Sequence, residues 1–264
     1  LKEEQPQLRI RNAAQALNVS EAELLATKIN KGVTRLVNKP KEILPEIESL
    51  GKVMALTRNE SCVHERKGIY LNPSIGKSPV GLFVGEDIDL RIFFMHWAFA
   101  FAVSEMARGK ERLSLQFFAE DGMAIHKIYL TPQSHVEAYK ALVEKYKSEE
   151  QNTKLEISVF AEAPRYKNDN EVDLAGFQKS WEELKDTHHF FGLLKKHNIS
   201  RSQALRLAPS AYYADKIEKE KIVSMLEKVA RQELPIMVFV GNPGNIQIHT
   251  GKINKTLWHQ QWFN

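Results

Sequence analysis

The stretch VMALTRNESCVHERKG, from Val53 to Gly68, has a counterpart 183 residues later in IMVFVGNPGNIQIHTG, from Ile236 to Gly251. Apolar residues recur at matching positions of the two stretches. Identical residues anchor the alignment at Met54 and Met237, Asn59 and Asn242, and Gly68 and Gly251. Similar segments at a fixed spacing indicate an internal repeat. The sequence therefore predicts a tandem duplication whose strongest trace is this pair of hairpin-like segments.

A second match lies upstream at nearly the same spacing. Asn18-Val19-Ser20 corresponds to Asn198-Ile199-Ser200, 180 residues later. Ser20 is followed by Glu23, and Ser200 by Gln203, which is the spacing of a capping box at the start of a helix. Each repeat is therefore expected to begin with helices.

Short strand-like segments without intervening helices follow in the first repeat, which predicts an antiparallel sheet. They are Lys52 to Arg58, Cys62 to Leu71, Val80 to Val84, Asp89 to Phe94, Phe99 to Glu105, Arg112 to Phe118 and Ala124 to Tyr129. A closing helix is predicted from Val136 to Tyr146. In the second repeat the predicted helices run from about Leu174 to Lys196, Arg201 to Leu207 and Glu218 to Gln232, before a hairpin of Ile236 to Val240 and Ile246 to Ile253.

These elements predict an α+β protein in which each repeat has a large antiparallel sheet flanked by helices. We expect an N-terminal repeat in residues 1–150, a linker region in 151–173 and a C-terminal repeat in 174–264. The second repeat has only a hairpin after its helices, and so we expect it to be truncated relative to the first.

The composition indicates a soluble globular protein of a reducing compartment. Of 264 residues, 43% are hydrophobic and 27% charged, with a formal net charge of +4. Cys62 is the single cysteine, so an intrachain disulfide framework and thiolate clusters are excluded. No stretch approaches the length of an apolar membrane helix, and the start lacks the apolar core of a signal peptide. A cytoplasmic location is expected.

The segment WEELKDTHHFFGLLKKHN carries the strongest local chemical signal. In a continuous helix, one stripe would hold Phe177, Trp181, Leu184, His188 and Phe191. A histidine in an aromatic stripe is either a core residue satisfied by its neighbours or an imidazole ligand for a metal. His189 is adjacent. The residues alone leave both interpretations open.

Two arginines could bind an anion near such a site. Arg201 begins a predicted helix, where the helix dipole favours anions. Arg91 alternates with apolar residues in a predicted strand and shares a face with Asp89 and Phe93. Either arginine could instead be an ordinary solvated side chain.

Other signals are absent or weaker. No HExxH motif, EF-hand loop, P-loop, dinucleotide fingerprint or G-x-S-x-G motif occurs, and the remaining histidines lack metal-ligand spacing. AAQALNVSEAELLATKI resembles a helix-turn-helix, which leaves DNA binding as an alternative. Against it, Glu21 and Glu23 would face phosphates at the start of the recognition helix.

Several long motifs in chain order resemble the HemS/ChuS family of cytoplasmic haem-trafficking and haem-degrading proteins. They are TRNESCVHERKG, GEDIDLRIFFMHW, LSLQFF with IHKIYLT, DTHHFFGLLKKHN with QALRLAP, and IMVFVGNPG with IQIHTG. The resemblance implies haem bound between tandem repeats of large antiparallel sheets. The family's proximal histidine falls on His188, with His189 as an alternate iron ligand. Its distal arginine falls on Arg91 and a propionate-binding arginine on Arg201.

The resemblance also assigns Phe93, Met237 and Phe239 to the binding site for haem b. It implies a protein of haem iron acquisition that carries haem, degrades it, or does both, with an inner-membrane importer and a haem oxygenase as expected partners. Whether the chain is an enzyme stays open. The alternative class is a non-enzymatic interaction protein that docks a haem oxygenase.

Overall fold

The computed structural model describes residues 8–107, 109–158, 165–185, 189–218, 220–259 and 262–264. The chain divides into two compact units. The first unit contains residues 1–160 together with 236–251, and the second contains 161–235 and 252–264. The hairpin of the second predicted repeat therefore belongs to the first unit, so the compact units do not follow the predicted repeat boundaries.

The larger sheet of the first unit, here called sheet A, has six strands in the order β1-β7-β8-β9-β2-β3. Every pair in it is antiparallel, as predicted. Its strands are β1 (Val33–Leu36), β2 (Gly51–Arg58), β3 (Val63–Gly68), β7 (Phe99–Ala107), β8 (Lys110–Phe118) and β9 (Ala124–Ser134). β1 was not predicted. β3 ends earlier than predicted, because Tyr70 turns into the core and is fully buried.

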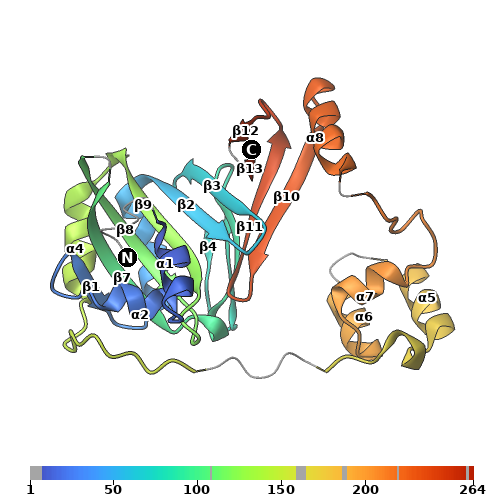
Figure 1. The fold of residues 1–264 in the computed structure, drawn as a ribbon, viewed down its shortest axis with the longest axis horizontal. Helices are drawn as coiled ribbons and strands as arrows, with labels where there is room; N and C mark the ends of the chain where they lie inside the picture. Colours follow the sequence, from blue (N-terminus) through green and yellow to red (C-terminus); the bar gives the residue numbers. More distant parts are fainter. Residues whose placement is uncertain (1–7, 108, 159–164, 186–188, 219, 260–261) are drawn as a thin grey trace. The chain divides into compact units, whose positions relative to one another are not determined.

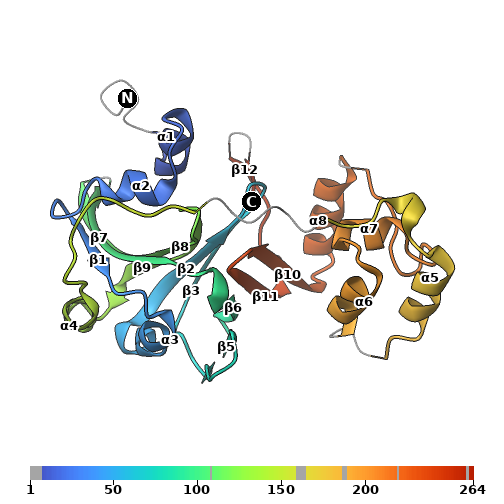
Figure 2. The same cartoon turned by 90° about the horizontal axis from the view of Figure 1, so that it is seen from below.

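The second sheet, sheet B, combines strands from both predicted repeats. Its order is β10-β11-β6-β5-β4, built from β4 (Pro73–Ser74), β5 (Val80–Val84), β6 (Asp89–Phe93), β10 (Pro235–Asn242) and β11 (Asn245–Lys252). β11 pairs antiparallel with β6, so that Ile246 lies opposite Arg91. Figures 1 and 2 show this late hairpin beside the strands of the first repeat.

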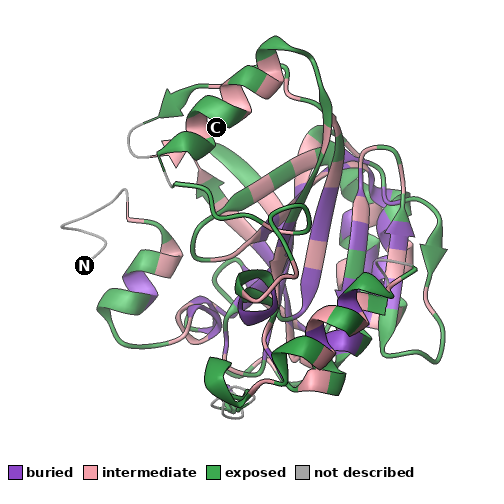
Figure 3. Cartoon of the chain, turned by 90° about the vertical axis from the view of Figure 1, so that its right-hand side faces the viewer, coloured by how far each residue is buried: buried purple, intermediate pink, exposed green. Residues whose placement is uncertain are grey.

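The core of the first unit lies between the two sheets. Inward side chains of β2, β8 and β9 meet those of β5 and β6, together with Trp97 and the short helical segments α3 (Pro40–Ile43), η1 (Leu44–Leu50) and η2 (Phe94–His96). The closing helix α4 (Val136–Tyr146) packs on this core and has the predicted bounds. A smaller cluster joins α2 (Glu21–Ala26) to the opposite face of sheet A. Buried residues accordingly run along the strands in Figure 3.

The predicted capping boxes are both confirmed. Ser20 caps α2 and Ser200 caps α7 (Arg201–Arg206), and each hydroxyl accepts from the backbone N–H three residues on. The preceding residues Asn18 and Asn198 both have φ 53°, a left-handed conformation that asparagine tolerates at the end of a helix. After α1 (Ile10–Ala16), the N–H of Val19 donates back to the carbonyl of Ala14 at 3.0 Å. After α6 (Phe190–His197), the N–H of Ile199 donates to that of Leu194 in the same way, at 3.1 Å. The two helix pairs are therefore local copies of one another.

The prediction of a single helix from Leu174 to Lys196 was wrong. α5 (Leu174–Glu182) has its C-cap at Glu183, and α6 begins at Phe190. The two helices pack against each other, and the ring of Trp181 lies 4.8 Å from that of Phe190, measured between centroids. A helix with two apolar faces must bury both, and division into two packed helices buries them against each other. The stripe that was to hold His188 is therefore not continuous.

The rest of the second unit is helical with a small terminal hairpin. Its core joins Phe177 and Trp181 of α5 to Leu193, Leu194, Ile199 and Ala204. A helical turn, η3 (Asp169–Glu171), precedes α5, and α8 (Lys221–Arg231) and the hairpin β12 (Trp258–His259) with β13 (Trp262–Phe263) follow α7. Within the described ranges, no helix is long and apolar enough to cross a membrane.

Candidate functional site

The face of sheet B that points away from the core carries Arg91 at its centre. On β6, Leu90 and Ile92 are buried, whereas Arg91 is exposed and Asp89 and Phe93 are half-buried. Successive side chains of a strand point to opposite faces, so Asp89, Arg91 and Phe93 share the open face. The alternation predicted from the sequence is confirmed.

The strands beside β6 surround Arg91 with apolar side chains. Leu82 of β5 and Ile246 of β11 lie directly opposite it in the two ladders. Val80 and Val84, two positions on either side of Leu82, are exposed on the same face. Within the described ranges, no side chain makes a hydrogen bond or an ion pair with Arg91. The arginine therefore presents a free guanidinium on an apolar surface.

Met237 and Phe239 extend this surface onto β10. A Cβ placed on Gly241 would meet Ile246 Cγ1 at 3.2 Å, so Gly241 belongs to the open face. Phe239 and Met237 follow at two-residue steps and face the same way. They are 56% and 55% exposed, values that are high for large apolar side chains in a sheet. The structure thus brings together four predicted site residues, Arg91, Phe93, Met237 and Phe239, on what we call the open face.

The remaining predicted residues belong to the second unit. His188 lies outside the described residues, as does the side chain of Phe191. His189 is the N-terminal cap position of α6 and is exposed. Arg201 is the first residue of α7, as predicted, and its guanidinium carbon lies 5.5 Å from the centroid of the Phe190 ring. A cation stacked on an aromatic ring keeps its charge available to an anionic ligand.

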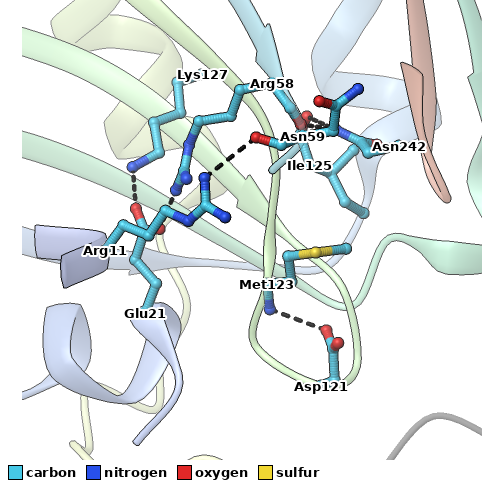
Figure 4. A network of polar contacts seen from close by, with 9 residues as sticks. All are labelled: Arg11, Glu21, Arg58, Asn59, Asp121, Met123, Ile125, Lys127 and Asn242. Carbon is cyan, nitrogen blue, oxygen red and sulfur yellow. Dashed lines mark hydrogen bonds and ion pairs between the residues drawn. The ribbon is translucent and has the colours of Figure 1, made fainter. Parts of the chain in front are cut away.

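Two asparagines hold the late hairpin in the first unit by reciprocal contacts. Asn242 Nδ2 donates to the carbonyl oxygen of Arg58 at 3.1 Å, and Asn59 Nδ2 donates to that of Gly241 at 3.0 Å. The Oδ1 atoms of Asn59 and Asn242 each also accept hydrogen bonds from two backbone N–H groups of the β-turn in which the asparagine lies. Asn59 and Asn242 are equivalent in the repeat alignment, so the two copies contact each other through the same atoms. Figure 4 shows both residues, with Asn242 also donating to the carbonyl of Ile125 at 2.8 Å.

Comparison with known proteins identifies the family. Residues 18–146 and 198–264 match the family described as the haemin-degrading HemS.ChuX domain. The chain belongs to the HemS/ChuX family.

Two curated proteins match along most of this HemS/ChuX chain. It is 34% identical over 254 residues to the hemin transport protein HemS of Yersinia enterocolitica, a match that covers 96% of this chain and 72% of that protein. It is also 34% identical over 263 residues to the hemin transport protein HmuS of Yersinia pestis, with 100% and 75% covered.

Solved structures agree with the fold. Holo-PhuS, a heme-binding protein from Pseudomonas aeruginosa, has a TM-score of 0.96 and 42% identity over 100% of this chain and 76% of its own. The heme-degrading enzyme ChuS of Escherichia coli O157:H7 has a TM-score of 0.90 and 32% identity with the same coverage. The α+β architecture with large antiparallel sheets, predicted from the sequence, is confirmed.

A buried polar cluster lies beneath the open face of this HemS/ChuX chain. His126 is fully buried, with Nε2 at 2.6 Å from Tyr70 Oη and Nδ1 at 2.9 Å from Thr57 Oγ1. Asn245 of β11 donates to Thr57 Oγ1 at 2.7 Å, so the cluster joins the two sheets. Burial lowers the pKa of His126 to about 3 and keeps its imidazole neutral. No local sequence pattern points to this role of His126, because its partners are 56 or more residues away along the chain.

A buried ion cluster fixes the helix pair at the start of the chain. Glu21, in the first turn of α2, pairs with Arg58 and Lys127 (Figure 4). Burial alone would raise the pKa of Glu21, but the charges of Lys127 and Arg58 bring it below its ordinary value. In a DNA-recognition helix, Glu21 would face phosphates. Its carboxylate instead neutralises two cations of sheet A, which leaves no role for it in a DNA interface.

The other titratable groups do not form a metal site. Within the described part of the chain, no group of three or more histidine, cysteine, aspartate or glutamate side chains could hold a metal ion. His64 and His249 lie with ring centroids 6.3 Å apart where β3 approaches β11. Cys62 is exposed, and partial burial raises the pKa of its thiol, which disfavours a reactive thiolate.

Proposed function

We propose that this protein binds haem b and serves haem iron acquisition in the cytoplasm, as a carrier that also opens the ring to a modest extent. Membership of the HemS/ChuX family supports the ligand class. The single observation on this chain that carries the proposal is the free guanidinium of Arg91 on the apolar open face of sheet B. A porphyrin is a large apolar disc with an ionic centre and anionic edges, and this combination suits such a surface.

The four gathered residues have complementary roles in this proposal. Phe93, Met237 and Phe239 would contact the porphyrin, because exposed aromatic and thioether side chains make large apolar contacts. Arg91 would lie over one face of the ring, where its five N–H donors can bind an anion near the iron. Because β6 and β10 come from different repeats, this surface needs the late hairpin in place.

The remaining predicted residues concern the iron ligand and a propionate contact. We propose His188 as the axial ligand, with His189 as the alternate, since neutral imidazole is a common ligand of haem iron. Arg201 would bind a propionate, because its stacked guanidinium is exposed and begins a helix. These assignments follow the matched family motif around His188.

Hemin titration of the purified chain tests the proposal. We expect a sharpened Soret band that saturates at about one hemin per chain. His188→Ala should shift the band and weaken binding, whereas His259→Ala, which removes an exposed histidine elsewhere in the second unit, should change neither. His189→Ala should have little effect if His188 alone is the ligand. A wild-type chain without any hemin-induced spectrum, or unchanged spectra in both His188→Ala and His189→Ala, would contradict the proposal.

A second measurement distinguishes a protein that only carries haem from one that also opens the porphyrin ring. Bound haem supplies the iron at which oxygen chemistry takes place, and Arg91 can hydrogen-bond an oxygen species there or block its access. We expect slow loss of the Soret band with ascorbate in the presence of catalase. If the band is lost only without catalase, free peroxide is the oxidant and the protein is a carrier.

The partners follow from this role. We propose that the protein receives haem after its import across the inner membrane and passes it to a haem oxygenase. Pull-down of such an oxygenase by the haem-loaded protein, compared with the His188→Ala variant, tests the second transfer. Equal capture by both forms would contradict a haem-dependent handover.

A further inference from the structure

Asp89 lies beside Arg91 on the open face, and neither the family motif nor the proposed function gives it a role. The two residues are separated by Leu90 on β6, so both side chains point away from the core. In the ladders, Asp89 lies opposite Val84 of β5 and Ile248 of β11, which are apolar. Its one charged neighbour on this face, within the described ranges, is Arg91.

The surroundings of Asp89 make this carboxylate sensitive to Arg91. Partial burial raises its pKa, and the charge of Arg91 lowers it. The nearby Asp87 is already paired, because Arg66 Nη2 donates to its Oδ1 at 2.6 Å. Glu86 is exposed and lies before the strand. Asp89 is thus the carboxylate that attracts the guanidinium of Arg91 through space, without a hydrogen bond or an ion pair between them.

We propose that Asp89 is a positioning residue that competes, through Arg91, with an anion bound over haem. A guanidinium that is attracted to a carboxylate two residues along its own strand is less free to donate to a second anion. The carboxylate would restrain Arg91 and so favour safe carriage over binding of an oxidant at the iron. This inference rests on the proposed function of the open face.

Fluoride is a suitable probe, because it binds ferric haem as a small anion and is held by hydrogen-bond donors. In the hemin complex, Asp89→Asn should lower the fluoride dissociation constant severalfold, because the negative charge that attracts Arg91 is removed. Arg91→Ala should raise it. Glu86→Gln, which removes an exposed carboxylate before the strand, is the matched control and should leave it unchanged. Asp89→Glu should restore wild-type behaviour in part.

The double variant Asp89→Asn with Arg91→Ala decides whether Asp89 acts through Arg91. Loss of the Asp89→Asn effect in the Arg91→Ala background supports the proposal. An equal effect in both backgrounds, or no effect in either, overturns it.

A measurement without haem keeps the inference separate from the proposed function. In the haem-free protein, NMR titration of the Asp89 carboxyl should give a higher pKa in Arg91→Ala than in the wild type. An unchanged pKa overturns the electrostatic coupling of Asp89 to Arg91. If hemin gives no Soret band at all, the proposed function fails, while this titration still tests whether Asp89 and Arg91 are coupled.

Discussion

At the scale of single residues, the first unit contains two buried titratable side chains whose charge states are set by their neighbours. His126, between the two sheets, is neutral, and Glu21, on the buried side of α2, is ionised. One group is held neutral and the other charged because their neighbours differ. His126 meets hydroxyl and amide groups, whereas Glu21 meets two cations.

His126 makes the stability of the first unit dependent on pH. Its pKa is about 3 in the folded protein and 6.5 in an ordinary environment, so between these values the unfolded chain binds one more proton. Stability is therefore fully present above pH 6.5 and is lost on acidification, by up to about 1.4 kcal/mol for each pH unit.

Urea unfolding at pH 7 and pH 5 measures this effect. His126→Gln should lower the unfolding free energy at pH 7, because the contacts with Tyr70 and Thr57 are lost. It should also reduce the difference between the two pH values. An undiminished difference in His126→Gln would show that other groups cause the pH dependence.

At the scale of elements, the hairpin of β10 and β11 is attached through its turn as well as through the β6 ladder. Asn59 and Asn242 make matching pairs of contacts that come from equivalent positions of the repeat. Trp97 Nε1 adds a bond to the carbonyl of Gly244 at 2.8 Å. Together with the β6 ladder, these contacts hold Met237 and Phe239 on the open face.

We predict that Asn242→Ala and Asn59→Ala each destabilise the first unit by about 1–3 kcal/mol, the usual cost of leaving buried polar groups without a partner. Asn152→Ala, which removes an exposed asparagine that accepts a hydrogen bond from Arg35, should cost much less. Hydrogen exchange should rise in β10 and β11 for both Asn242→Ala and Asn59→Ala. Unchanged exchange in this hairpin would mean that the β6 ladder alone holds it.

At the scale of the whole molecule, the chain consists of two compact units with separate cores. Residues 1–150 and 174–264 remain a proposal for the repeats, because repeat boundaries concern ancestry and the units concern packing. The second core is small. It is centred on Phe177, which is fully buried against Trp181 and the ring of His197.

We predict that Phe177→Ala unfolds or loosens the second unit alone. Truncation of a buried phenylalanine costs about 3–5 kcal/mol, which is large for a core of this size. Hydrogen exchange should increase in α5, α6 and α7, while the strands of sheet A keep their protection. Phe177→Leu, which retains most of the volume, should have a smaller effect. Loss of protection in both units would show that they fold as one.

The sequence by itself determined the elements that depend on near neighbours. Apart from β1 and β4, the strands of the first repeat followed from side-chain alternation, and both capping boxes from residues three positions apart. The closing helix α4 was also predicted from the sequence. The duplication was also readable, because it needs only a comparison of the chain with itself. Of the predicted site, the open face of β6 followed from alternation alone.

The tertiary structure decided what depends on distant residues. Pairing of β11 with β6 joins strands about 150 positions apart in the sequence. A local sequence pattern does not determine the strand with which a hairpin will pair. The same holds for the neighbours of Arg91, the reciprocal asparagines and the partners of His126. The division of this segment into α5 and α6 also escaped prediction, because two apolar faces on one segment fit a single buried helix as well as two helices packed together. Only packing of Trp181 against Phe190 distinguishes the two, and that contact exists only in three dimensions.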